Sequence, residues 1–356
     1  MLKGWAEHPG GRHHGAHGAA VSKLLDVSAG ELLDFSQNVN PLGAPVGAID
    51  AARRALYEES GRYPDPGYPR LREALAAYLG VSSDKIVPTN GGTEALFLAA
   101  LSAGVEGKAL ILEPTFSEYA AAARAAGLEP VRRVARRPED GFRFDPAAID
   151  DLEGIALVFL CNPNNPTGDA LTRAEVLEVA DGVRERGAVL VVDEAFADFT
   201  PGVSVAGEVD TGLYVARSFT KFFAIPGLRL GSLVCGDPGH VESFQPSWSV
   251  NSVAAAAGTV AVQDQNFVDA SISEVAHLRA ELFEALETLP GLTPLPGAAN
   301  FLLVHGPQGL SERLARRGVL VRGCEPFVGL GPGYFRVAVR DAGENGRLVA
   351  AIREEL

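Results

Sequence analysis

The chain has 356 residues, enough for about two domains, and its content of 47% hydrophobic and 21% charged residues is ordinary for a globular enzyme. A formal net charge of −14 argues against nucleic acid or an anionic membrane as the main partner, although a locally positive pocket can still bind small anions. The three cysteines are scattered and lack metal-ligand spacing, which predicts a protein without disulfides or a metal site. The sequence has no apolar run near the ~18 residues of a membrane span and no signal-peptide pattern, so we expect a cytoplasmic protein.

The first predicted elements are an irregular arm and a helix. Residues 1–45 are rich in Gly, His and Pro, and we expect them to form an N-terminal arm that packs with the small domain and the active site. The stretch “PRLREALAAYLG” begins at Pro69 and ends at Gly80, with its large apolar residues on one helical face. It is therefore predicted to be a helix.

From about residue 86, short apolar runs alternate with helical segments. The apolar runs lie at 109–112, 155–160, 188–192 and 213–216. The helical segments lie at 93–103, 116–126 and 172–186. Continuous apolar strands alternating with helices are typical of a buried, mainly parallel sheet. In such sheets functional side chains gather at the carboxyl ends of the strands.

The pattern changes after residue 250. Two long helices are predicted within 250–265 and 267–289, then short strands at 301–304, 318–321 and 334–339, and a last helix near 344–354. The sequence thus predicts an α/β protein with an arm (1–45), a large domain (46–250) and a smaller α+β domain (251–356).

Two segments that open a helix or follow a strand could bind polar ligands. In “TNGGTEALFLA”, Gly91 and Gly92 leave bare N–H groups at a helix start, which favours an anion site; the alternative is a glycine turn with Thr93 as the cap. In “FLCNPNNPTG”, Asn165 could bond a phenolic oxygen; the alternative is a turn held by asparagine side chains.

Two further segments carry charged groups. In “VVDEAFADF”, Asp193 ends an apolar strand, and a carboxylate there needs either a protonated pyridine nitrogen or a structural arginine as its partner. In “SFTKFFAIPGLRLGS”, Ser218, Thr220 and Arg229 could hold a phosphate. Lys221 is either a solvated lysine or an amine that bonds to a carbonyl cofactor. Together the four segments supply the set of groups that pyridoxal 5′-phosphate needs.

The motifs “NNPTG”, “DEAF” and “SFTKFFAIPGLRLG” occur in this order, and over almost its whole length the chain resembles the fold-type-I pyridoxal-phosphate enzymes of the class-II aminotransferase group, which includes histidinol-phosphate aminotransferase. The resemblance implies an aminotransferase-like fold with a three-layer α/β/α large domain. It implies that Lys221 bonds to the cofactor, Asp193 pairs with the pyridine nitrogen and Asn165 binds the ring hydroxyl. The implied phosphate contacts are Gly92, Thr93, Ser218 and Arg229.

The same resemblance adds residues from other segments. Phe116, in “EPTFSEY”, matches the aromatic residue that stacks on the cofactor ring. Tyr63, in “GRYPDPGYPRLREAL”, matches a tyrosine that reaches the cofactor phosphate of the neighbouring subunit, which implies a homodimer with shared active sites. Arg336, in “YFRVAVR”, matches the arginine that binds a substrate anion.

Further candidates for substrate contacts are Arg322, His8 and Asn40. Arg322 ends the predicted strand “GVLVR” and is either a ligand or a surface arginine. His8 belongs to the His-rich arm, for which the alternative is a solvated segment. Asn38 and Asn40 either contact the substrate or cap turns of the arm.

Three stretches, “LLDFSQNVNPLGAP”, “WSVN” and “GLGPGYFRVAVR”, resemble the L-threonine-O-3-phosphate decarboxylases of cobalamin synthesis, as does Phe196 where related aminotransferases often have tyrosine. This implies loss of CO₂ from L-threonine O-3-phosphate to give (R)-1-amino-2-propanol O-2-phosphate. The alternatives are an aminotransferase acting on histidinol phosphate or another amino acid, and a non-catalytic regulatory domain. The short arm and the acidic charge argue against the DNA-binding module that such a regulator needs.

Overall fold

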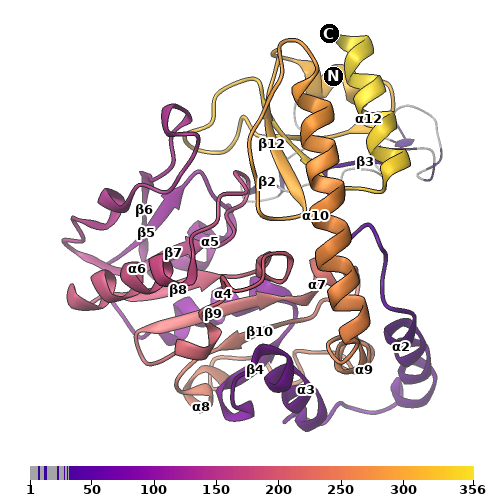
Figure 1. Cartoon of the computed structure of the whole chain (residues 1–356). Helices are drawn as coiled ribbons and strands as arrows, with labels where there is room; N and C mark the ends of the chain where they lie inside the picture. The colour runs from indigo at the N-terminus through magenta and orange to yellow at the C-terminus, as the bar shows by residue number, and fades with distance from the viewer. Residues whose placement is uncertain (1–6, 9–11, 14–21, 24–27, 29, 31) are drawn as a thin grey trace.

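The computed structural model describes residues 7–8, 12–13, 22–23, 28, 30 and 32–356, and its central element is a seven-stranded sheet (Figure 1). Strand β10 is antiparallel to both of its neighbours, and the other strands of this sheet run in one direction. The predicted α/β fold with a mainly parallel sheet is confirmed. The strand order is β4 (Ile86–Thr89), β10 (Gly231–Val234), β9 (Leu213–Ser218), β8 (Val189–Asp193), β7 (Ile155–Cys161), β5 (Lys108–Glu113) and β6 (Glu129–Val134).

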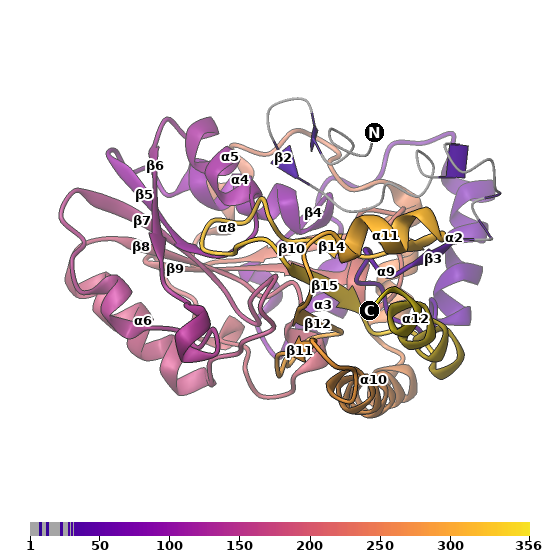
Figure 2. The ribbon, with the colours of Figure 1, turned by 90° about the horizontal axis from the view of Figure 1, so that it is seen from above.

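Helices cover both faces of this sheet, because successive residues of a strand point to opposite sides and both sides are apolar. In β5, Ala109 and Ile111 pack with α4 (Gly91–Ser102) and α5 (Glu118–Ala125), whereas Leu110 and Leu112 pack with α6 (Arg173–Glu185) on the other face. Figure 2 shows α4 and α5 on one side of the strands and α6 on the other. The helices around the sheet are α3 (Pro69–Leu79), α4 (Gly91–Ser102), α5 (Glu118–Ala125), α6 (Arg173–Glu185), α7 (Phe219–Phe222) and α8 (Pro238–Glu242).

Three more helices lie beside this part, and the last two lead along the chain to the C-terminal part. They are α2 (Val46–Glu59), α9 (Ser252–Ala261) and α10 (Gln265–Glu287). Alanines allow α2 and α9 to pack closely, with Ala48 and Ala52 in the same core as Ala254 and Ala257. Figure 1 shows α10 running from α9 up to the second sheet. The boundaries at residues 45 and 250 stay a prediction.

The second sheet has four strands, in the order β11 (Thr293–Pro294), β12 (Phe301–His305), β15 (Tyr334–Ala338) and β14 (Arg322–Gly323). Helices α11 (Leu310–Arg316) and α12 (Ala342–Glu355) contribute Leu314, Leu348 and Ile352 to its core. The strand expected at 318–321 is divided. Only β13 (Val319–Leu320) forms there, and it pairs in parallel with β3 (Leu33–Asp34), while Arg322 continues into β14.

The end of the arm is thereby joined to the last part of the chain. The amide of Phe35 donates to the carbonyl of Leu320 at 2.7 Å, and its carbonyl accepts from the amide of Ala338 at 2.9 Å. Earlier in the arm, β1 (Glu7–His8) pairs antiparallel with β2 (Arg12–His13), so the arm is not wholly irregular. No helix in the described ranges is both long enough and apolar enough to cross a membrane.

Candidate active site

A cavity of about 310 Å³ lies at the carboxyl ends of the parallel strands, facing β14 and β15 of the second sheet. Residues of the cavity wall lie at or shortly after the ends of four parallel strands, β5, β7, β8 and β9. This is the edge of an open parallel sheet at which ligands bind. The cavity brings together most of the residues singled out from the sequence. Those residues are Gly92, Thr93, Phe116, Asn165, Asp193, Ser218, Lys221, Arg229, Arg322 and Arg336.

Asp193 is the last residue of β8 and is buried at the cavity wall. One carboxylate oxygen, Oδ2, accepts from the hydroxyl of Tyr119 at 2.7 Å, and Oδ1 accepts from the amide of Ala195 at 3.0 Å. Burial raises the pKa of Asp193 to about 6, and both hydrogen bonds oppose that rise. The carboxylate is thus oriented from two sides by donors that favour its charged form.

Lys221 lies in the one-turn helix α7, which directly follows β9. Burial lowers the pKa of its amine to about 8, and the positive charges of Arg336 and Arg229 lower it further. A larger fraction of the amine is therefore neutral near pH 7 than for a solvated lysine, and only the neutral amine is a nucleophile.

An anion cradle lies at the start of α4. The φ of Gly91 is +79°, and a Cβ there would lie 2.6 Å from a terminal guanidinium nitrogen of Arg229. A Cβ on Gly92 would lie 3.0 Å from the Cβ of Ser218, whose hydroxyl is 2.9 Å from that of Thr220. The two glycines thus let a guanidinium and two hydroxyls approach the helix N-terminus, where N–H groups and the helix dipole favour an anion.

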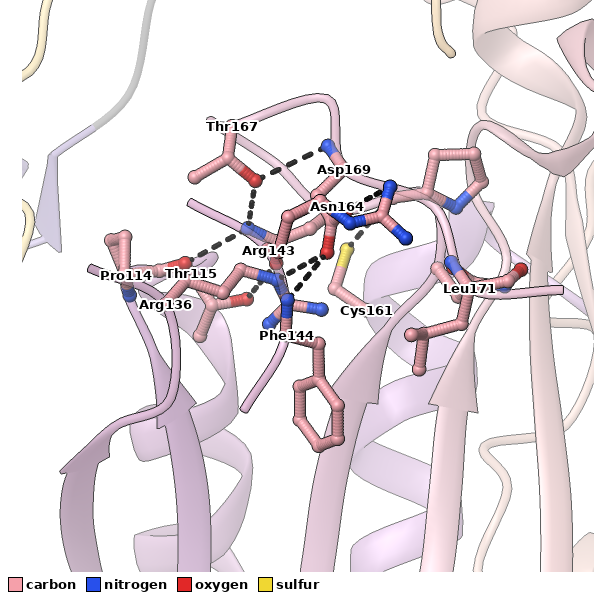
Figure 3. Close-up of polar contacts among 12 residues, drawn as sticks. Pro114, Thr115, Arg136, Arg143, Phe144, Cys161, Asn164, Thr167, Asp169 and Leu171 are labelled. Atoms are coloured by element: carbon pink, nitrogen blue, oxygen red, sulfur yellow. Dashed lines mark hydrogen bonds and ion pairs between the residues drawn. The ribbon is translucent and has the colours of Figure 1, made fainter. Parts of the chain in front are cut away.

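The loop that carries Asn165 is fixed by its neighbours (Figure 3). Asn164 donates to the carbonyl of Pro114 at 3.0 Å and to Thr167 at 2.9 Å, and it accepts from Thr115 at 3.1 Å. The Asn162 side chain pairs in the same way with the backbone of Leu171. Asparagine-held turns therefore account for Asn162 and Asn164, whereas Asn165 faces the cavity.

The next residues of this loop are attached to the protein interior. Figure 3 shows Asp169 between two arginines: it accepts from Nε of Arg136 at 3.2 Å and lies 3.3 Å from the guanidinium of Arg143. The amide of Phe144 also donates to Asp169, at 3.1 Å. Both ends of the loop are thus held away from the cavity, which leaves little freedom to the residue between them.

Arg336 and Arg322 form the opposite wall, at paired positions of β15 and β14. Arg336 donates to Oδ1 of Asn165 and, at 3.0 Å, to the carbonyl of Ser36. No carboxylate of the described residues forms an ion pair with it. Burial lowers the pKa of Arg336 to about 10 and also lowers that of Arg322. This wall therefore carries buried positive charge.

Three predicted residues are not in the described wall of the cavity. Asn40 accepts from the amide of Leu42 at 3.0 Å and donates to the carbonyl of Phe222 at 2.8 Å and to Ser271 at 2.9 Å, and the bond to Leu42 favours the capping interpretation over a substrate contact. Tyr63 is 79% exposed, with its ring 4.5 Å from that of Trp248. The side chain of His8 lies outside the described part of the chain.

Sequence reasoning missed several residues of the site. Tyr119 bonds Asp193 from behind the cavity, and the only sequence signal is its position one helical turn after Phe116. Phe327 also lines the cavity, as do Ser36, Gln37 and Val39 around the candidate Asn38. Nothing in their local pattern indicates this, because they reach the cavity through pairing of β3 with β13 and of β14 with β15.

The donor set fits pyridoxal 5′-phosphate. The cradle at Gly92, Ser218 and Arg229 supplies donors for a phosphate, and it exists only because the glycines lack side chains. Asp193 is a buried carboxylate suited to a protonated ring nitrogen, and Lys221 is an amine with a lowered pKa.

Comparison with known proteins agrees with this chemistry. Residues 24–352 match the family model described as aminotransferase class I and II. The chain is 39% identical to threonine-phosphate decarboxylase of Salmonella typhimurium, over 96% of each chain.

Two solved structures are also similar. Histidinol-phosphate aminotransferase from Clostridium acetobutylicum has a TM-score of 0.83 and 28% identity, covering 91% of this chain and 99% of that one. L-threonine-O-3-phosphate decarboxylase from Porphyromonas gingivalis has a TM-score of 0.77 and 25% identity, covering 90% and 98%. Because the family model spans nearly all of the sequence, the chain belongs to the aminotransferase class I and II family and is an enzyme whose cofactor is pyridoxal 5′-phosphate.

Proposed function

We propose that this protein is a cytoplasmic decarboxylase that converts L-threonine O-3-phosphate to (R)-1-amino-2-propanol O-2-phosphate for the side chain of cobalamin. The observation that carries the proposal is the pair of buried arginines on one cavity wall, Arg322 and Arg336. The similarity to the Salmonella threonine-phosphate decarboxylase supports the same substrate.

The charge of the cavity favours a substrate with two anionic groups. A phosphorylated amino acid carries a carboxylate and a phosphate, and each matches a guanidinium in geometry and charge. Arg336 and Arg322 stand over the rings of Phe301 and Phe327, at 5.1 and 5.6 Å, which limits their movement. Histidinol phosphate has a phosphate but no carboxylate, so only one of the two arginines would gain an anionic partner.

The residues that would hold the cofactor are those of the cradle and of the strand ends. Gly92, Thr93, Ser218 and Arg229 would bind the phosphate, and Phe116 would cover a ring face. Asp193 would keep the ring nitrogen protonated, and Asn165 would bond the ring hydroxyl. When bound in this way, pyridoxal phosphate supplies an electron sink for the pair left at the substrate Cα.

In this proposal Lys221 has two tasks. Its neutral amine would hold the cofactor covalently while no substrate is bound. When the bond between Cα and the carboxylate breaks, the electron pair stays at Cα and CO₂ leaves. The ammonium form of Lys221 then delivers a proton from Nζ to Cα and recovers it from solvent. A pKa of about 8 keeps both forms of the amine populated near neutral pH.

We also propose that the enzyme is a homodimer in which Tyr63 reaches the cofactor phosphate of the neighbouring subunit. The exposure of Tyr63 supports a role outside its own cavity. Large apolar side chains of α2 are exposed nearby in the sequence, with Val46, Leu56 and Tyr57 at 77%, 61% and 91%. Such side chains favour burial against a second copy.

The direct test is an incubation of the protein and pyridoxal phosphate with L-threonine O-3-phosphate in the absence of any keto acid. Steady release of CO₂ over many turnovers is the expected result. A single half-turn that stops with the cofactor as its amine form, and that 2-oxoglutarate restarts, would instead indicate an aminotransferase.

The aminotransferase is the second candidate, and the similarity to the Clostridium histidinol-phosphate aminotransferase favours it. Histidinol phosphate and 2-oxoglutarate are the substrates that would reveal it.

A further inference from the structure

Tyr119 connects two side chains that are proposed to hold the cofactor ring from different sides. It is fully buried in the first turn of α5, and it does not itself line the cavity. Its hydroxyl donates to Oδ2 of Asp193 at 2.7 Å. Its ring meets that of Phe116 edge to face, at 5.8 Å and 83°.

The hydroxyl is held in the donating state. Burial raises the pKa of Tyr119 well above its ordinary value, and the charge of Asp193 raises it further. The phenol therefore keeps its proton over the working pH range, and Asp193 is its acceptor. A hydrogen bond from a neutral donor to a charged carboxylate is among the stronger kinds, because only the charged form gains the full interaction.

The ring is equally constrained. It stacks on Phe159 of β7 at 5.1 Å and an interplanar angle of 7°, with the edge contact to Phe116 on another side. Since a buried ring packed in this way cannot rotate away, the hydroxyl cannot leave Asp193 without disturbing the sheet.

The other charged groups around Asp193 act on its pKa in opposite directions. The neighbouring Glu194 raises the pKa of Asp193, whereas Arg217 of β9 lowers it. Cys161 of β7 also faces this cluster, and burial raises the pKa of its thiol to about 12, so it stays neutral. Tyr119 is thus the side-chain donor that favours the carboxylate form of Asp193 by direct contact.

We propose that Tyr119 is a positioning residue that keeps Asp193 ionised and aimed at the cofactor ring nitrogen while supporting Phe116 behind the ring face. The inference rests on the role proposed for Asp193 but not on the substrate, so it holds equally for a decarboxylase and for an aminotransferase.

The test uses full-length protein reconstituted with pyridoxal phosphate labelled with ¹⁵N in the ring, and the ring nitrogen is titrated by NMR. In Tyr119→Phe, the ring nitrogen should lose its proton at a pH lower by about one unit or more. The dissociation constant of pyridoxal phosphate should rise by about tenfold. An unchanged ring-nitrogen titration in a folded Tyr119→Phe protein would overturn the proposal.

The matched control is Tyr78→Phe. Tyr78 donates to Asp198 at 2.8 Å, which is a half-buried tyrosine–aspartate bond outside the cavity. The Tyr78→Phe variant should show the same ring-nitrogen titration as the wild type. An equal shift in both variants would mean that Tyr119 acts only through general stability.

Two further variants separate the possible failures. In an Asp193→Asn background, adding Tyr119→Phe should change the cofactor dissociation constant by less than about twofold, because there is no carboxylate left to favour. If Asp193→Asn alone leaves the ring nitrogen unaffected, then the proposed role of Asp193 fails.

If Tyr119→Phe does not fold, 3-fluorotyrosine at position 119 is the alternative, because it keeps the shape of tyrosine and is a stronger donor. The ring nitrogen should then keep its proton to higher pH, and the absence of a shift would overturn the inference.

Discussion

Two buried arginines of this protein have opposite surroundings. Arg217 of β9 is 3% exposed and donates to two carboxylates, to Glu194 at 2.7 Å and to Asp198. Arg336 of β15 is 7% exposed, and its partners in the described chain are the neutral oxygens of Asn165 and Ser36.

The difference appears in their proton affinities. Burial alone lowers the pKa of Arg217, but the charges of Asp198 and Glu194 outweigh burial and raise it. Arg336 has no carboxylate partner in the described chain, and burial lowers its pKa to about 10. A buried charge with fixed partners contributes to a folded structure, whereas one without them keeps its binding capacity for a ligand.

The largest expected effect comes from another cation of the cavity, Lys221. In Lys221→Ala, gel-filtered protein should lose the visible absorbance of the lysine-bound cofactor, and turnover should fall by at least about 1,000-fold. Urea denaturation should show little loss of stability, because the amine is a cavity group without an ion pair in the described chain. Unchanged colour would count heavily against the proposed role of Lys221.

Arg217→Met should be the most destabilising change at an arginine. Removal of the guanidinium leaves Glu194 and Asp198 buried without their cation, which costs about 3–5 kcal/mol. The free energy of unfolding in urea measures this loss. Arg143→Met is the control, since Arg143 is 65% exposed in its ion pair with Asp169 and should cost less than about 1 kcal/mol.

Arg336→Met should have the reverse pattern. The value of kcat/KM for the phosphorylated substrate should fall by about 30- to 1,000-fold, which corresponds to about 2–4 kcal/mol. Stability in urea should stay equal or rise, because an uncompensated buried charge is removed. Arg340→Met is the control, because Arg340 pairs with Glu344 at 2.9 Å outside the cavity. A loss of stability in Arg336→Met without a change in kcat/KM would contradict the proposed difference between Arg336 and Arg217.

A smaller effect is expected in the pH dependence of cofactor uptake. Because the pKa of Lys221 is lowered to about 8, the neutral amine appears as the pH rises through 8. The rate at which apoprotein develops cofactor absorbance should therefore rise with a midpoint near pH 8. In Arg336→Met one neighbouring positive charge is gone, so the midpoint should move to higher pH. A midpoint near the value of a solvated lysine, or a shift downward, would contradict this.

The smallest effect should follow from a neutral change on the cavity wall. Phe196→Tyr adds a hydroxyl where this chain has a buried ring packed against Phe301 at 5.0 Å. A donor to the ring oxygen should lower, by less than about one unit, the pH at which the visible absorbance of the bound cofactor titrates. A rise or no shift in a spectral titration would refute the argument.

The sequence predicted best those parts whose patterns are local. The strands near 155–160 and 188–192 are recognisable because both of their faces are buried and nearly every residue is apolar. The cavity residues after these strands could be predicted because their motifs are short and in a fixed order. Strand β6, with Arg132 and Arg133 at the sheet edge, and β4, which contains Pro88, have no such pattern.

Long-range pairing could not be predicted from the sequence. The run at 318–321 has the pattern of one strand, but Leu320 pairs with Asp34 whereas Arg322 pairs with Arg336. The bond from Tyr119 to Asp193 likewise joins distant segments. Asn38 and Asn40 have similar local sequences, and only the tertiary structure separates Asn38 at the cavity from Asn40 in its cap.

The pairing of residues 33–35 with the C-terminal part has a consequence for synthesis on the ribosome. The carbonyls of Gly318 and Leu320 that accept its amides are made long after this segment. The cavity wall at Ser36, whose carbonyl accepts from Arg336, therefore cannot close until the chain has been synthesised as far as Arg336. Until then the emerging enzyme can fold its parallel sheet but has no finished place for a substrate.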